Sequence, residues 1–78
     1  METYWLKFYC DTDKERNKLM TWQINSIFDL DTALLRWVKR VNYIRAAWFV
    51  TKRDGAVVSS ERIDLDRFAN DKEIILTK

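Results

Sequence analysis

The sequence has no histidine, no proline, one glycine and one cysteine. Without histidine, the chain lacks the usual general base, the partner of a Cys–His nucleophile pair and the commonest transition-metal ligand. A single glycine is too few for the phosphate-binding loops of P-loop and Rossmann proteins. These absences exclude the common catalytic and metal-binding motifs. We therefore expect a protein that is not an enzyme and that binds no cofactor and no metal.

The single cysteine, Cys10, excludes an intramolecular disulfide framework. Such sparing use of cysteine is typical of reducing compartments, and we expect a cytoplasmic protein. Within a strand, a lone cysteine is more often a small buried hydrophobe than a reactive thiol. No apolar run approaches the ~18 residues of a membrane helix, so we expect no membrane contact.

The acidic residues are the remaining candidates for catalysis or metal binding. Those at 11–15 alternate as in a calcium-binding loop, but that loop's glycine and distant glutamate are missing. Two Asp-Leu-Asp motifs, at 29–31 and 64–66, present paired carboxylates that a glycosidase or a divalent ion could use. Helix capping explains both motifs without a reaction, so we assign them a structural role.

Length and charge limit the fold and its partners. The chain of 78 residues suits a single domain over residues 1–78, and its four Trp, four Phe and three Tyr supply an efficient core for that size. Fourteen basic and twelve acidic residues leave a net charge of +2. That balance is unlike a strongly basic nucleic-acid-binding domain, whose pI exceeds about 9.

Alternation of polar and apolar residues predicts an antiparallel hairpin at the start of the chain. Residues 3–10 and 20–26 each alternate with period two, and the charged segment 11–18 forms the turn between them. One face of each strand is apolar and is expected to point inward. The inward residues are Tyr4, Leu6, Phe8 and Cys10 in the first strand and Met20, Trp22 and Ile24 in the second.

Apolar residues at helical spacing predict one main helix over about residues 30–41. Asp29 or Asp31 is expected to cap its amino end. The apolar stripe consists of Leu30, Leu34, Trp37, Val38 and Val41. The opposite side carries a basic patch of Arg36, Lys39 and Arg40, which we interpret as a solvated helix face, with phosphate or acidic-partner contact as the alternative.

A second hairpin is predicted around Gly55. Before it, strict alternation places Ile44, Ala46, Trp48 and Val50 inward and Arg45 and Phe49 outward. A two-residue turn would oppose apolar to polar residues on the inner face. We therefore expect a three-residue loop over 53–55 with Gly55 left-handed at a bulge, which pairs Val50 with Val58.

The end of the chain is predicted less completely. Residues 64–70 suit a short second helix capped by Asp64, and 72–78 suits an edge strand, with a helical extension or disorder left open. The predicted fold class is α+β. It is a ββαββ two-layer domain with a mostly antiparallel four- or five-stranded sheet and the main helix on one face.

The outward side of this sheet is the candidate binding face. Aromatic residues interleave with cations there, a mixture found in protein–protein hot spots and in surfaces that stack bases. The predicted face consists of Trp5, Lys7, Tyr9, Arg45 and Phe49. The same residues could also simply pack under the final segment or against a second copy.

The leading functional hypothesis is therefore a non-catalytic protein-interaction module. It would bind a protein partner, or itself as a homodimer, through this face or through an exposed strand edge. Single-stranded nucleic-acid or RNA binding through the same face is the alternative. In size and layout the chain resembles small ββαββ proteins of phages and other mobile elements, which implies an accessory or inhibitor role as a further alternative.

Overall fold

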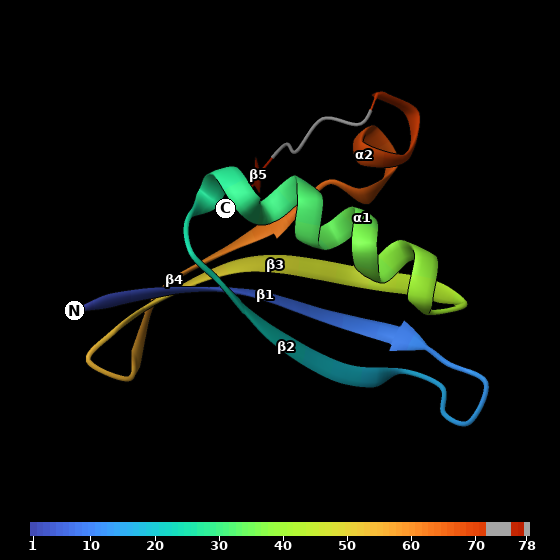
Figure 1. Cartoon of the computed structure of the whole chain (residues 1–78), viewed down its shortest axis with the longest axis horizontal. Coiled ribbons are helices and arrows are strands. Elements are labelled where there is room, and N and C mark those ends of the chain that lie inside the picture. Colours follow the sequence, from blue (N-terminus) through green and yellow to red (C-terminus); the bar gives the residue numbers. More distant parts are fainter. Residues whose placement is uncertain (72–75, 78) are drawn as a thin grey trace.

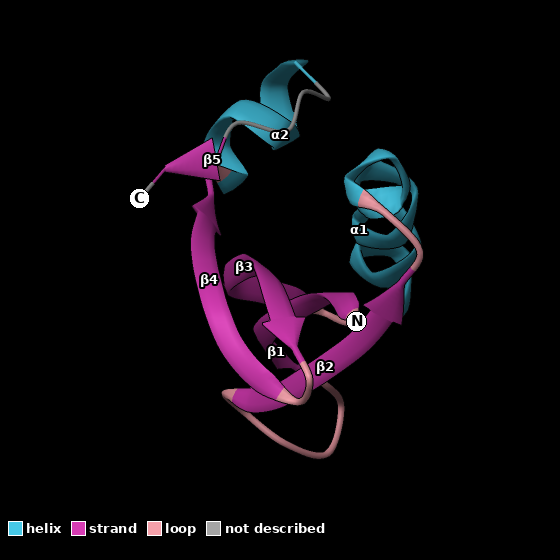
Figure 2. Ribbon diagram, turned by 90° about the vertical axis from the view of Figure 1, so that its left-hand side faces the viewer, coloured by secondary structure: helices cyan, strands magenta, loops and turns pink. Residues whose placement is uncertain are grey.

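Within the part of the chain that the structure describes, five strands form one antiparallel sheet in the order β2-β1-β3-β4-β5, and both helices lie on one side of it (Figures 1 and 2). The structure is a computed structural model that describes residues 1–71 and 76–77. The α+β two-layer fold and the main helix are as predicted. The elements are β1 (Glu2–Asp11), β2 (Lys18–Ile24), the 3-10 turn η1 (Ile27–Asp29), α1 (Leu30–Arg40), β3 (Tyr43–Arg53), β4 (Ala56–Ile63), α2 (Leu65–Asp71) and β5 (Leu76–Thr77).

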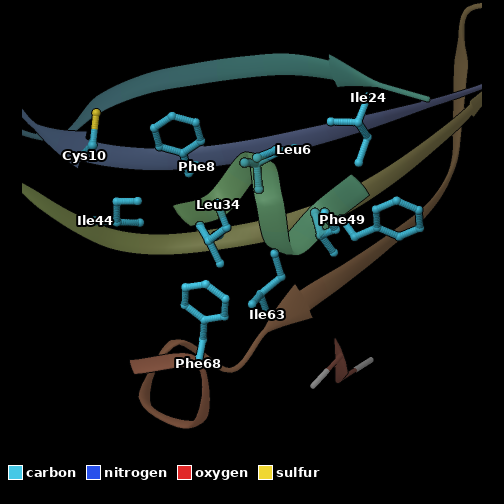
Figure 3. Close-up of a cluster of buried hydrophobic side chains, with 12 residues drawn as sticks. Leu6, Phe8, Cys10, Ile24, Leu34, Ile44, Phe49, Ile63 and Phe68 are labelled. Atoms are coloured by element: carbon cyan, nitrogen blue, oxygen red, sulfur yellow. The ribbon is translucent and has the colours of Figure 1, made fainter. Parts of the chain in front are cut away.

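The predicted first hairpin is confirmed. β1 and β2 pair in regular antiparallel register, with Leu6 opposite Trp22 and Phe8 opposite Met20. The inward side chains of β1 lie in the core, where Leu6, Phe8 and Cys10 have no exposed surface (Figure 3). Burial of Cys10 raises the pKa of its thiol, which agrees with the expected inert, structural cysteine.

Helix α1 covers the inner face of β1 and β3. Leu30 and Leu34 are fully buried, as the apolar stripe predicts, but Val38 is exposed and Ala33 takes a buried place. Asp29 occupies the N-cap position of α1, as one of the two alternatives predicts, but its side chain makes no capping hydrogen bond. The chain enters the helix through η1, whose cap is Ser26, and the Phe28 backbone N–H donates to the Ser26 hydroxyl oxygen at 3.2 Å.

A β-bulge in β3 overturns the predicted faces of that strand. The pairing of β1 with β3 shifts between Tyr9, which lies opposite Ala46, and Cys10, which lies opposite Ile44. Arg45 is therefore an extra residue, and every side chain after it points to the other side of the sheet. Phe49 is consequently 6% exposed and lies in the core (Figure 3). Trp48, which was expected inside, lies on the outer side.

The turn between β3 and β4 also differs from the prediction. Asp54 and Gly55 have φ of 51° and 85°, and Arg53 pairs with Ala56. This is the two-residue type I′ turn, in which both central residues are left-handed. The predicted three-residue loop rested on an inward Val50, and the bulge at Arg45 removed that premise. The expected left-handed conformation of Gly55 is correct.

A second bulge follows this turn. Lys52 pairs with Val57 and Thr51 with Ser59, so Val58 is the extra residue and Val50 lies opposite Ser60 rather than Val58. The bulge sits on β4, the strand that leads to the second helix.

The short second helix is present as predicted. The Asp64 side chain accepts a hydrogen bond from the Arg67 backbone N–H at 3.1 Å, which caps α2. Phe68 of α2 and Ile63 of β4 complete the core below α1. β5 pairs with β4 through residues 76–77, in agreement with an edge strand there, while 72–75 and 78 lie outside the described residues.

Candidate binding face of the sheet

The sheet has an inner face, covered by α1 and α2, and an outer face that no other described element covers (Figure 2). The register places the outward side chains in rows that cross the strands from β2 to β4. One row runs Thr21, Lys7, Trp48 and Arg62, and the next runs Gln23, Trp5, Val50 and Ser60. Leu19, Tyr9 and Ala46 lie beyond the first row, and Thr3, Lys52 and Val57 beyond the second. Together these residues make up the outer face.

The structure brings together three of the five predicted face residues. Trp5, Lys7 and Tyr9 all point outward from β1. Phe49 is in the core, and Trp48 occupies the position expected for it. Arg45 lies at the end of the face, where its guanidinium makes two hydrogen bonds of 2.8 Å to the Asp11 carboxylate.

Sequence reasoning missed Trp48, Lys52 and Arg62 as members of this face. All three follow the bulge at Arg45 or the one at Val58. A bulge at a non-glycine residue has no strong sequence signature. The only available signal was that the adjacent bulky residues Trp48 and Phe49 must point to opposite sides, so one of them had to face outward.

The aromatic rings of the outer face are covered by cations of the same chain. The Lys7 Nζ lies 5.3 Å from the ring centre of Trp48, and the Arg62 guanidinium carbon lies 5.7 Å from it. Lys52 Nζ lies 4.6 Å from the ring centre of Trp5. The ring of Tyr9 meets Trp48 edge to face at 5.8 Å. Cation–π attraction holds this layer together and keeps positive charge at its surface.

No carboxylate points outward from the rows of described residues that make up the outer face. Lys7 and Lys52 also form no salt bridge with the described part of the chain. Hydrogen bonds from Arg45 and from the Asn17 backbone N–H lower the pKa of the carboxyl of Asp11, at the end of β1, so this group stays ionised, and its ion pair with Arg45 balances its charge. The outer face therefore combines a positive potential with aromatic and aliphatic surface.

A shallow hollow of about 260 Å³ lies in the middle of the outer face. Its floor is Val50, which is 5% exposed although it lies outside the core cluster. The hollow is lined by Trp5, Lys7, Thr21, Val50, Lys52, Val57 and Ser60. An apolar floor with two lysines at the rim is suited to a partner side chain with an apolar stem.

The predicted basic patch lies on the opposite side of the molecule. Arg36, Lys39 and Arg40 are exposed on α1, and the Arg40 guanidinium covers the ring of Trp37 at 5.7 Å. A groove of about 580 Å³ lies nearby, between α1, α2 and the ends of β3 and β4. The basic patch is separate from the outer face, whereas the groove borders it, because Arg45 and Arg62 line the groove.

Residues 1–71 and 76–77 contain no cluster of three or more potential metal ligands, and none of their helices is long and apolar enough to cross a membrane. No family model, no curated protein and no solved structure matches this chain, so its function has to be inferred from its own residues.

Proposed function

We propose that this protein is a small non-catalytic binding module whose outer face binds an acidic surface of a protein partner. One observation carries the proposal: an uncovered sheet face presents two tryptophans, a tyrosine and cations, with no carboxylate among its described residues. Trp, Tyr and Arg dominate protein–protein hot spots, and like charges on one face select an oppositely charged partner.

The geometry favours a protein over single-stranded nucleic acid as the occupant. Base stacking needs a free ring face. Lys7 and Arg62 already cover Trp48, and Lys52 covers Trp5. A base would have to displace these cations, whereas an Asp or Glu side chain contacts them from outside without disturbing the rings. The sequence pI of about 8.8 is also low for a nucleic-acid-binding domain.

Site-specific photocross-linking in the native host tests this proposal. Gln23 is exposed beside Trp5 on the outer face, so a benzophenone amino acid at this position reports what docks there. We expect a discrete adduct that protease destroys and nuclease does not. The adduct should disappear in the double variant Lys7→Glu, Lys52→Glu, because charge reversal repels an acidic partner.

The matched control is Lys14→Glu, Lys39→Glu, which makes the same change of charge at exposed positions away from the face. It should leave the adduct intact. Adducts that only nuclease removes would instead support the nucleic-acid alternative. In that case, the affinity for a labelled oligothymidine should fall steeply between about 50 and about 200 mM salt. An adduct with a protein other than this chain that survives the reversal of Lys7 and Lys52 would refute the proposed face.

A further inference from the structure

Strand β2 forms one edge of the sheet, and only its side facing β1 is paired with a described strand. Its pairing with β1 has no register shift, and its residues 19–23 contain no charge, proline or glycine. Natural proteins protect sheet edges with charges, prolines, bulges or covering segments. The outer edge of β2 is therefore a regular and unprotected template for another strand.

The opposite edge of the sheet shows that this chain does protect an edge. β4 is interrupted by the bulge at Val58, carries Glu61 and Arg62, and is covered at its end by β5. None of these devices occurs on β2 between Leu19 and Gln23. The contrast points to a role for the bare edge of β2.

Exposed apolar side chains gather around the same edge. Leu19 and Trp22 on β2 are exposed, the latter by 41%, although Trp22 points toward the helix layer. The turn that follows β2 adds Ile27 and Phe28, and Phe28 is 87% exposed. Leu19 and Trp22 point to opposite faces of the sheet, so these exposed side chains flank the free edge of β2 on both faces and continue past its end, where a strand added to this edge would meet them.

We propose that β2 pairs antiparallel with β2 of a second copy of this chain, about a two-fold axis at Thr21. In this register, Trp22 lies opposite Met20 of the second copy, so apolar residues meet on the inner side. Thr21 lies opposite Thr21, a favourable cross-strand pair. The strand thus complements itself, as a two-fold interface requires.

Charge supports the antiparallel arrangement. Lys18 is the only charged residue of β2. Antiparallel pairing about Thr21 places it opposite Ile24 of the second copy, so the two lysines lie at opposite ends of the interface. On the inner side of β2 the ring of Trp22 packs edge to face on Trp37 of α1, with ring centres 5.4 Å apart, while no described strand pairs with the outer backbone edge of β2.

The dimer has a consequence for the outer face. A two-fold axis perpendicular to the sheet keeps both outer faces on the same side of one continuous sheet. An extended acidic partner then meets two copies of the face, and the second contact benefits from high effective concentration. The pairing itself does not depend on the proposed function, because it rests on β2 alone.

Cysteine cross-linking tests the register directly. The variant Thr21→Cys places two thiols opposite each other, at a distance compatible with a disulfide. We expect a covalent dimer on mild oxidation, and the native Cys10 should stay silent because it is buried. The matched control is Val57→Cys, at an exposed residue near the opposite edge of the sheet, which should form no covalent dimer.

Sedimentation of the unmodified protein supplies the second measurement. The apparent molar mass should rise from that of a monomer to that of a dimer as the protein concentration increases from about 5 to about 500 µM, because dimerisation follows mass action. Thr21→Lys should weaken the dimer at least about tenfold by opposing two charges at the axis, while Val57→Lys should not. A wild-type protein that stays monomeric throughout overturns the proposal, whatever other strand β2 then binds. Equal cross-linking of Thr21→Cys and Val57→Cys overturns it as well.

Discussion

Replacing Phe49 and Trp48 separately tests which of these neighbours belongs to the core. Phe49 is 6% exposed and its ring stacks on that of Tyr4, with centres 5.9 Å apart and planes inclined by 9°. Truncation of a buried Phe to Ala lowers the free energy of unfolding by ~3–5 kcal/mol, because buried apolar groups are lost and a cavity is left in their place. Trp48→Ala removes a partly exposed ring and two cation contacts of ~0.5–1 kcal/mol each, so a loss of about 1–2 kcal/mol is expected.

These costs are large compared with the total stability of the chain. At ~0.05–0.15 kcal/mol per residue, 78 residues give a free energy of unfolding of ~4–12 kcal/mol. Phe49→Ala therefore removes much of the stability and leaves the fold marginal. Phe49→Leu keeps most of the volume and should cost about 1–1.5 kcal/mol, which provides a variant that still folds.

Urea unfolding followed by far-UV circular dichroism measures these differences. With a slope of ~1 kcal/mol per molar urea for a domain of this size, Trp48→Ala should lower the midpoint by about 1–2 M. Phe49→Ala should lower it by about 3 M or leave no folded baseline. If Trp48→Ala destabilises the protein more than Phe49→Ala, then Trp48 points inward. The assignment of a bulge at Arg45 would then be wrong, and so would the set of residues assigned to the outer face.

Two further predictions concern the turn and the end of the face. Gly55→Ala should lower the free energy of unfolding, measured in urea, by ~1–2 kcal/mol. The reason is the φ of 85°, which strains a residue with a Cβ even though the added group meets nothing within 4 Å. An unchanged free energy of unfolding would contradict the type I′ turn. Arg45→Ala should destabilise the protein at pH 7, because the pKa of Asp11 is lowered from its ordinary value of 3.8 only in the folded state. That stabilisation is fully present above pH 3.8 and is lost as the pH falls through the lowered pKa, so wild type and variant should converge in acid; a difference that persists there would indicate that Arg45 acts through packing.

Local sequence patterns were sufficient for the elements that depend on local spacing. Period-two alternation predicted the β1–β2 hairpin and the buried Leu6, Phe8 and Cys10. Helical spacing predicted α1, and the capping potential of Asp64 predicted α2. In each case, the physical preference acts between residues that are close in the chain or that repeat along one face.

The candidate face could be predicted only in part, for the same reason. Trp5, Lys7 and Tyr9 lie on an uninterrupted strand, so alternation assigned them correctly. The assignment of Trp48 and Phe49 failed because one inserted residue, Arg45, reverses every later side chain. Nothing in the residues around 45 signals such an insertion.

By itself, the sequence determined the order of elements, the apolar face of each regular element and the absence of histidine, and with it of the catalytic motifs that need one. Only the tertiary structure decided the two bulges, the turn type at Gly55 and the row in which Lys7, Trp48 and Arg62 meet. These features arise from pairing between segments far apart in the chain. Their positions are set by which register buries the most apolar surface against α1, and that balance exists only once the sheet and the helix have come together.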